Sequence, residues 1–305
     1  MKSQLTTSLS QLTPISNKAI AMVTAKKSKF TKMKTIFYFS AIIFSLFLTS
    51  CEEVVNVDLD TAAPRLVVDA SINWEQGTDG AEQKIKLTTT TSYYSSTVPM
   101  VSGATVFVEN SNNIIFNFIE VPNTGEYVCS NFVPQLNEIY TLTVISNGQT
   151  YTATESLRSV ASIQEIVQDN EGGITGDQIE IKTFFNDPNE EDNFYMFKYK
   201  YSNKNKLDYQ VSDDKFFQGN SFFSLSNNED LSAGDQVDVT HYGISRSYYN
   251  YMNILLSVAG NTGGSPFQSP PATVRGNIIN TTNFDNYALG YFRLSETDSA
   301  SYIVE

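Results

Sequence analysis

The chain has 305 residues, of which 41% are hydrophobic, and a formal net charge of -13. This composition is too apolar for a disordered chain and is sufficient for packed cores in one to three domains. Residues 1–50 hold seven of the 20 basic residues and no acids, so the remainder carries 13 basic against 33 acidic residues, a net charge of about -20. Such an acidic surface argues against nucleic acid as a partner and against charge-driven adsorption to a membrane.

The first 50 residues are predicted to be a targeting segment that is not part of the fold. An uncharged run of 13 residues, from Ile36 to Leu48, follows a basic stretch. It is too short for a spanning helix, which needs about 20 apolar residues, and it has the length of a signal-peptide core. The run ends at Leu48-Thr49-Ser50-Cys51, which resembles the lipobox of a bacterial lipoprotein. We expect residues 1–50, including an upstream extension, to be removed and Cys51 to be lipidated. The alternative is a buried core helix.

Residues 51–63 are predicted to be an acidic tether. Glu52, Glu53, Asp58 and Asp60 follow Cys51 closely and leave this stretch without a core of its own. The acids resemble the surface-export signal of Bacteroidota lipoproteins, which implies a lipid-anchored protein of the outer membrane, exposed at the cell surface. The alternative is a solvated tether without an export role.

Residues 64–157 are predicted to form a first domain, an Ig-like or transthyretin-like β-sandwich. About seven short segments alternate apolar and polar residues at a spacing near ten residues, which is typical of sandwiches. Thr105 to Phe118 and Ile139 to Ala153 each read as a hairpin, the second turning at Asn147-Gly148. The order of glycines, tyrosines and valines between Gly103 and Val144 is similar to that of transthyretin-like and carboxypeptidase-regulatory-like sandwiches.

Three aromatic residues in this first domain are candidates for ligand binding. Trp74, the single tryptophan, precedes a loop-like run, and Tyr93 and Tyr94 lie in a Ser/Thr-rich stretch. Loop aromatics can stack on sugar rings or anchor a protein partner. They can equally pack against their own sheet.

The residues that support common enzyme and metal sites are scarce. With Cys51 lipidated, Cys129 has no disulfide partner and is expected to be a buried structural thiol. His241 is the single histidine, expected at a strand end or on the surface without a catalytic role. The acids Glu190, Glu191 and Asp192 lack the interleaved spacing of a calcium loop. We therefore expect no metal, no cofactor and no catalysis.

Residues 158–305 are predicted to form a second β-rich domain with one amphipathic helix. Alternating segments, among them residues 178–184 and 193–201, predict strands, and Phe216-Phe217 is read as continuing this pattern. Residues 208–219 are expected to be an irregular loop. Apolar residues at i, i+4, i+7, i+8 and i+11 from Tyr248 predict a helix over residues 245–259.

The C-terminal segment carries the most distinctive motif. It reads Ser-Pro-Phe-Gln-Ser-Pro-Pro from Ser265, then Arg275-Gly-Asn-Ile, and later Leu289-Gly-Tyr-Phe. This is similar to the signature of the lipoproteins grouped as domain of unknown function 4249, with Ser265 in place of the usual Asn. The motif residues are Pro266, Phe267, Pro270, Pro271, Gly276, Asn277, Gly290, Tyr291 and Phe292. We interpret them as a structural clamp across the sheet rather than a ligand site.

The resemblance implies an outer-membrane lipoprotein that is often paired with a TonB-dependent transporter and has no established activity. The expected function is that of a non-catalytic accessory or nutrient-capture partner of such a transporter. The alternative is a stand-alone glycan- or protein-binding module, or adhesin, that uses Trp74 and Tyr93/Tyr94. A hydrolase that uses paired acids or His241 is a third hypothesis.

Overall fold

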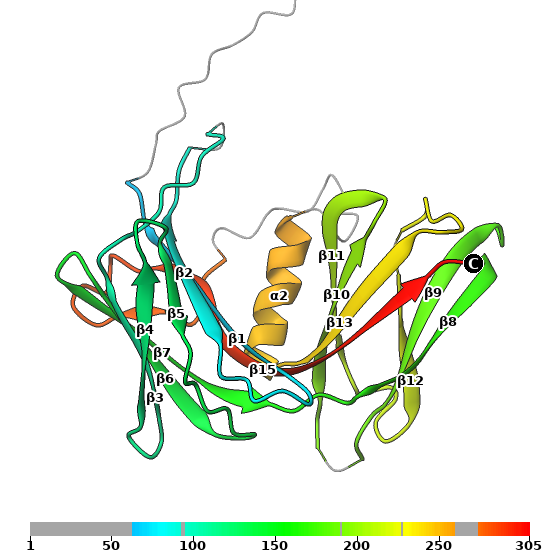
Figure 1. Cartoon of the computed structure of the whole chain (residues 1–305), viewed down its shortest axis with the longest axis horizontal. Coiled ribbons are helices and arrows are strands. Elements are labelled where there is room, and N and C mark those ends of the chain that lie inside the picture. The colour runs from blue at the N-terminus through cyan, green and yellow to red at the C-terminus, as the bar shows by residue number, and fades with distance from the viewer. Residues whose placement is uncertain (1–62, 93–94, 190, 227, 260–273) are drawn as a thin grey trace, which may run out of the picture. The chain divides into compact units, whose positions relative to one another are not determined.

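The computed structural model describes residues 63–92, 95–189, 191–226, 228–259 and 274–305 (Figure 1). Within them the chain is mainly β, with one helix, as the sequence predicts. The elements are β1 (Leu66–Glu75), β2 (Gln83–Thr89), β3 (Thr105–Asn110), β4 (Ile115–Val121), β5 (Glu126–Cys129), β6 (Ile139–Ser146), β7 (Gln149–Arg158), β8 (Ile163–Gly172), β9 (Gln178–Asn186), β10 (Phe194–Tyr201), β11 (Lys204–Asp213), β12 (Ser221–Leu225), β13 (Gln236–Gly243), α2 (Arg246–Val258), β14 (Ile279–Asn280) and β15 (Leu289–Ile303).

The last strand, β15, joins the two halves of the fold. Twelve strands form one sheet in the order β11-β10-β13-β15-β1-β2-β5-β4-β3-β6-β7-β14. The first part of β15 pairs in parallel with β1, and its last part pairs antiparallel with β13. A short parallel pairing of Leu294 and Ser295 with the end of β7 connects β15 to β7, so the strands β1 to β7 and β15 form a closed ring of pairings. β1 pairs with its sequence neighbour β2 on one side and therefore depends on the far end of the chain for its other strand partner.

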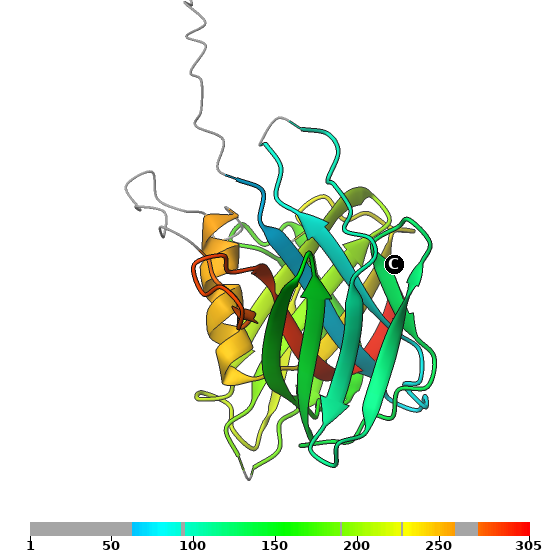
Figure 2. The same cartoon turned by 90° about the vertical axis from the view of Figure 1, so that its left-hand side faces the viewer.

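The first half is a β-sandwich whose inner faces hold an apolar core. Alternate residues point inward along each strand, so β4 buries Phe116 and Phe118 and exposes Asn117 between them. Both predicted hairpins form, and the turn at Asn147-Gly148 has positive φ at both positions, the geometry of a type I′ turn. Figure 2 shows these strands from their outer side.

The second half packs a three-stranded sheet, β12-β9-β8, over a core rich in aromatic rings. Two predictions in this region are wrong at least in part. Of the loop predicted over residues 208–219, residues 208–213 belong to the edge strand β11, whereas residues 214–219 do form a turn. Phe216 and Phe217, predicted to continue the strand pattern, lie in that turn before β12. Phe217 is buried because that turn folds back over the sheet, and this tertiary contact leaves no trace in the local sequence pattern.

The predicted helix is confirmed as α2. Ser245 caps its N-terminus by accepting a hydrogen bond from the Tyr248 backbone N–H. Its buried face consists of Tyr248, Met252 and Leu256, one side of a 3.6-residue period, and it packs on Met196, Tyr242 and Tyr291 of the large sheet. The helix thus covers part of one face of that sheet (Figure 1).

The predicted boundary after residue 157 separates two cores, although the strands that build them are shared. The first core contains Ile278, Ala288, Phe292 and Leu294, which come from the end of the chain. Residues Thr61–Glu305 form one compact unit. The division into two domains at residues 157 and 158 stays a prediction.

Candidate functional site

The described part of the C-terminal motif acts as a clamp. The side-chain amide of Asn277 donates to the Phe292 carbonyl oxygen at 2.8 Å and accepts from the Phe292 N–H at 2.9 Å. Phe292 lies on β15 just before the residues that pair with β7. The amide therefore takes the place that a neighbouring strand would occupy. It satisfies two backbone groups that would otherwise be left without a partner.

Two glycines of the motif permit close backbone contact. A Cβ on Gly276 would overlap the carbonyl oxygen of Gly290, and a Cβ on Gly290 would overlap that of Val68 on β1. Gly290 also has φ of 92°, a conformation that favours glycine. The segment that carries Gly276 can approach β15, and β15 can approach β1, only because both positions lack side chains.

Tyr291 contributes a third contact of the clamp. Its hydroxyl lies 3.3 Å from Oε2 of Glu155, which also accepts from the N-cap Ser245 at 2.8 Å. Burial raises the pKa of Tyr291, so the hydroxyl stays protonated. The contact ties β15 to β7 and to the start of α2. The motif residues Pro266, Phe267, Pro270 and Pro271, and the predicted lipidation site Cys51, lie outside the described residues.

Of the three predicted aromatic ligand residues, the described structure includes Trp74. The ring of Trp74 packs against the first core, and its Nε1 donates to the Thr78 carbonyl oxygen at 2.9 Å. Trp74 thus covers its own turn, the packing alternative considered from the sequence. Tyr93 and Tyr94 lie outside the described residues.

His241 is neither at the surface nor at a strand end, so that prediction is wrong. It lies within β13, fully buried, and stacks on Phe197 at 4.1 Å between ring centroids. Among the described residues no hydrogen bond of normal geometry reaches either ring nitrogen. Desolvation lowers the pKa of His241 to about 3, and the nearby Ala161 backbone offsets this only in part. A neutral ring enclosed by aromatic side chains has no access to a substrate.

Cys129 is a buried free thiol, as the sequence predicts. Its Sγ donates to Oδ1 of Asn131 at 3.2 Å. Burial raises the pKa of this thiol, which keeps it protonated and unreactive.

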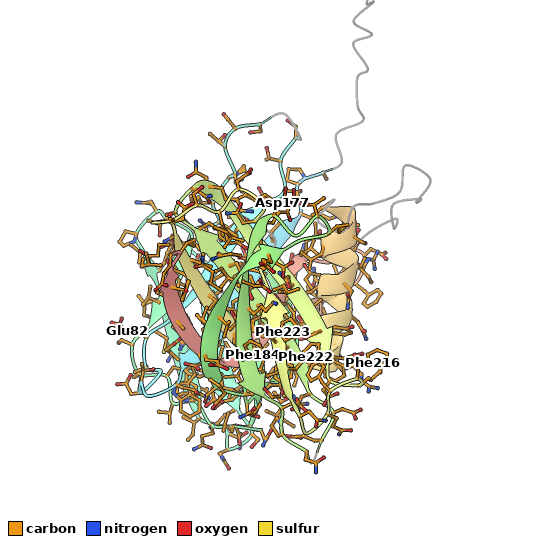
Figure 3. The ribbon with its side chains drawn as sticks, turned by 90° about the vertical axis from the view of Figure 1, so that its right-hand side faces the viewer. Glu82, Asp177, Phe184, Phe216, Phe222 and Phe223 are labelled. Carbon is orange, nitrogen blue, oxygen red and sulfur yellow. The ribbon has the colours of Figure 1, made fainter. Side chains whose placement is uncertain are left out.

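A cluster of exposed and half-buried phenylalanines, not predicted as a site from the sequence, is the main candidate for a binding surface. This aromatic patch, defined as Phe184, Phe216, Phe222 and Phe223, lies on β9, β12 and the turn before β12 (Figure 3). Phe216 is 95% exposed and Phe222 37%. Large exposed apolar side chains that gather on one surface are a sign of a docking site.

Three of the four rings of the aromatic patch pack against neighbouring rings. Phe222 stacks on the buried Phe217 at 4.1 Å, and Phe184 contacts Phe223 at 5.1 Å. Phe184 and Phe223 are also direct cross-strand neighbours. Side chains fixed in this way lose little conformational entropy when a partner binds.

Acidic side chains flank the aromatic patch. Glu165 on β8 lies opposite Phe184, and Asp169 and Glu180 lie opposite each other further along the same sheet. Lys182 and Asp169 neutralise each other in an ion pair at 2.6 Å, which leaves Glu165 and Glu180 as the acids that give this border its charge. The patch is therefore apolar with an acidic border, which is complementary to an apolar surface bordered by basic residues.

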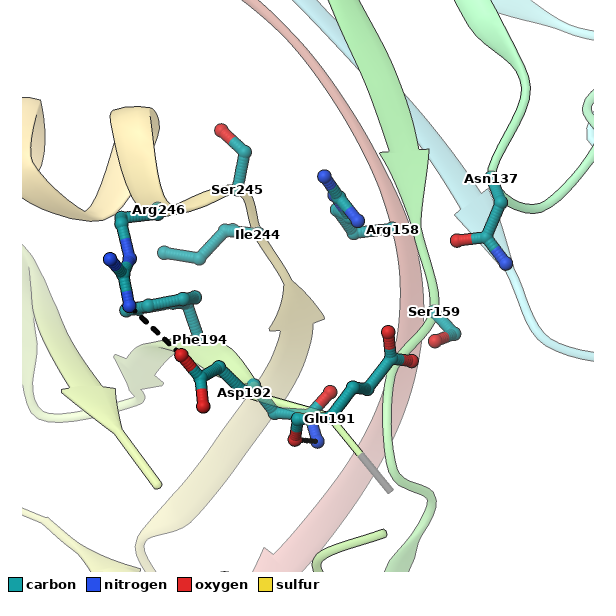
Figure 4. A pocket seen from close by; sticks show the side chains of 10 residues that line it. Asn137, Arg158, Ser159, Glu191, Asp192, Phe194, Ile244, Ser245 and Arg246 are labelled. Carbon is teal, nitrogen blue, oxygen red and sulfur yellow. Dashed lines mark hydrogen bonds and ion pairs between the residues drawn. The ribbon is translucent and has the colours of Figure 1, made fainter. Parts of the chain in front are cut away.

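A small polar hollow lies where α2 begins (Figure 4). It has a volume of about 90 Å³ and is lined by Arg158, Glu191, Asp192, Ser245 and Arg246, among others. Asp192 and Arg246 form an ion pair at 2.9 Å in which both side chains are mostly exposed, so it adds little stability. The hollow holds both signs of charge and has room only for water or a very small ligand.

The described residues define a class of protein rather than a reaction. No three His, Cys, Asp or Glu side chains among them are grouped so that they could hold a metal ion. In the same part of the chain, no helix combines the length and the apolar character needed to cross a bilayer. The described structure is thus that of a β-sandwich protein with an aromatic patch at its surface and a clamped C-terminal segment.

Comparison with known protein families identifies the family of this chain. The chain belongs to the family described as domain of unknown function DUF4249, whose profile matches residues 52–301. No curated protein matches the chain.

The chain is also similar to several solved structures. One is a segment of two fibronectin type III domains from chicken tenascin, 12% identical, with 59% of this chain and 90% of that chain covered and a TM-score of 0.20. Another is a cytokine receptor complex, 8% identical, with coverage of 60% and 86% and a TM-score of 0.25. These likenesses carry no argument about function.

Proposed function

We propose that this protein is a lipid-anchored, surface-exposed lipoprotein of the Bacteroidota outer membrane. In this proposal it acts as a non-catalytic accessory, or nutrient-capture partner, of a TonB-dependent transporter. Family membership, the lipobox-like Leu48-Thr49-Ser50-Cys51 and the acidic stretch behind it support the anchor. The partner is proposed from the family resemblance and from the surface described above.

The observation that carries the docking role is the aromatic patch. Its most exposed member, Phe216, projects from a turn, and the patch surrounds no deep cavity among those found in the described residues. A raised apolar surface buries far more area against another protein than against a small solute, and phenylalanine anchors contribute strongly to such interfaces. The acidic border would steer a partner with basic residues.

Site-specific crosslinking in the native membrane tests this role. A photo-crosslinking amino acid replaces Phe216 in one variant and Ile119 in a control variant. Ile119 is 70% exposed on β4, in the other half of the fold. After irradiation and detergent extraction of outer membranes, the Phe216 variant is expected to capture a TonB-dependent transporter and the Ile119 variant is not. Recovery of no transporter, with the lipoprotein intact, would contradict the proposal.

A second pair of variants examines the contribution of the side chains. Phe216→Ser removes the exposed ring, and Ile174→Ser removes another fully exposed apolar side chain in the turn between β8 and β9. Co-purification with the transporter should fall for Phe216→Ser and stay unchanged for Ile174→Ser. Equal retention by both variants would show that the patch is not the docking surface.

A further inference from the structure

Two arginines that are far apart in the sequence enclose one tyrosine ring. The guanidinium carbon of Arg65 lies 3.9 Å from the centroid of the Tyr287 ring, and that of Arg275 lies 3.7 Å from the same centroid. Groups of this size cannot share one face of the ring, so they lie on opposite faces. Arg65 is fixed further by donating to the Asp285 carbonyl oxygen at 3.2 Å.

Neither arginine has an acidic partner among the residues that the structure describes. The ion pairs of the described residues involve other cations, and no carboxylate among these residues lies within 4.0 Å of the two guanidinium groups. The predicted mature part of the chain carries a net charge of about -20, so two adjacent cations without an ion pair among the described residues form a locally positive site on an otherwise acidic protein. Guanidinium groups bind phosphate through paired hydrogen bonds, and stacking on an aromatic ring leaves their N–H edges available.

Apolar side chains border the two cations. Phe284 is 74% exposed and Ile279 is 52% exposed. Both line a shallow cavity of about 130 Å³ together with Arg275 and Tyr287. The arginine–tyrosine patch, defined as Arg65, Arg275, Tyr287, Ile279 and Phe284, thus combines phosphate-binding groups, an interfacial tyrosine and exposed apolar groups. This is the composition of a surface that rests in the headgroup region of a bilayer.

The position of the patch along the chain indicates which surface covers it. Arg65 is the third described residue and lies 14 positions after Cys51. A fully extended tether of that length reaches no further than roughly 50 Å. Through Arg65, the patch lies close in sequence to the proposed anchor. Once the lipid holds the protein at a membrane, a weak contact becomes effectively intramolecular.

We infer that the arginine–tyrosine patch is the membrane-facing surface of the protein and that it binds phosphate-bearing lipid headgroups. This inference rests on the proposed lipid anchor. The segment that carries Ile279, Phe284 and Tyr287 is orange in Figure 1 and lies on the other side of the fold from β12. Contact with the membrane there leaves the aromatic patch free for a protein partner.

Fluorescent probes on the full, lipidated chain test the inference. Phe284→Cys and, as the matched control, Phe216→Cys each receive a polarity-sensitive dye. Cys129 is buried and an acylated Cys51 has no free thiol, so labelling is selective. The proteins are reconstituted into vesicles of phosphatidylethanolamine and phosphatidylglycerol. Spin-labelled lipids are expected to quench the dye at position 284 several-fold more than the dye at position 216.

Arginine variants show whether the cations are responsible. In the Phe284→Cys background, Arg65→Gln with Arg275→Gln should abolish the excess quenching, whereas Arg65→Lys with Arg275→Lys should retain most of it. Equal quenching at positions 284 and 216 on lipidated, vesicle-bound protein would overturn the inference. If inorganic phosphate then bound the detergent-solubilised chain through the two arginines, their ligand would be a soluble anion.

Mass spectrometry of the same preparations separates this inference from the proposal on which it rests. A lipid mass on Cys51 with a solvent-exposed dye at position 284 would contradict the membrane-facing surface alone. Absence of a lipid mass on Cys51 would overturn the anchor, and with it the inference.

Discussion

The carbonyl oxygen of Val68 overlaps the position that a Cβ on Gly290 would occupy, where β15 and β1 run in parallel. Gly290→Ala would place a methyl group on that oxygen and would also force alanine to adopt φ of 92°. Gly234 has nearly the same φ, 93°, but no atom lies within 4 Å of the place that a Cβ would occupy there. We expect Gly234→Ala to cost about 1–2 kcal/mol of unfolding free energy and Gly290→Ala more than about 4 kcal/mol. Urea denaturation of both variants measures the difference, and equal losses would contradict the clash.

The clamp made by Asn277 gives a second prediction. Asn277→Ala leaves the N–H and carbonyl of Phe292 without their partners, which we expect to lower the unfolding free energy by about 1–3 kcal/mol for each group that water cannot reach. Asn277→Asp keeps the acceptor for the Phe292 N–H but sets a carboxylate against the Phe292 carbonyl oxygen. Asn117→Ala, at an exposed position of β4, is the control and should change little. Thermal unfolding should show a lower midpoint temperature for Asn277→Ala and Asn277→Asp than for the wild type, and little change for Asn117→Ala.

His241 makes stability depend on pH. Its pKa is about 3 in the folded chain and about 6.5 when exposed. Below pH 6.5 the unfolded state takes up a proton that the folded state cannot accept. The free energy of unfolding therefore falls as the pH decreases from about 6.5 to about 3, by up to roughly 5 kcal/mol.

Replacing His241 separates its contribution from those of other titrating groups. His241→Phe preserves an aromatic ring in the stack with Phe197 and cannot be protonated. Its unfolding free energy should fall less steeply over the same pH range, and His241→Leu should behave in the same way if the effect comes from the proton. Parallel pH profiles for the wild type and both variants would contradict the assignment.

Trp74 is expected to stabilise its own turn rather than to bind a ligand. Trp74→Phe removes the hydrogen bond to the Thr78 carbonyl oxygen and should lower stability by about 1 kcal/mol, as measured by circular dichroism. Any binding to a glycan array should survive the substitution. Loss of glycan binding without loss of stability would instead favour the alternative of a glycan-binding module.

Several features of this protein follow from the sequence alone, because they depend on local periodicity and turn chemistry. Alternation of apolar and polar residues is sufficient to specify half-buried strands, and the Asn147-Gly148 turn forms because both residues tolerate positive φ. The apolar spacing from Tyr248 and the capping residue Ser245 define α2 in the same way. Gly276, Asn277 and Gly290 are residue types suited to close backbone contacts, so the sequence also predicts a structural role for this described part of the C-terminal motif.

Tertiary structure decided which of these residues meet. Burial of His241 results from β9 and β10 packing their rings around it, and β11 forms because it pairs with β10. In the aromatic patch, Phe184 on β9 precedes Phe216, the next member along the chain, by 32 positions. Arg65 reaches Tyr287 across 222 positions only because β15 returns to lie beside β1. Contacts of this range arise from strand order, which a local sequence pattern does not encode.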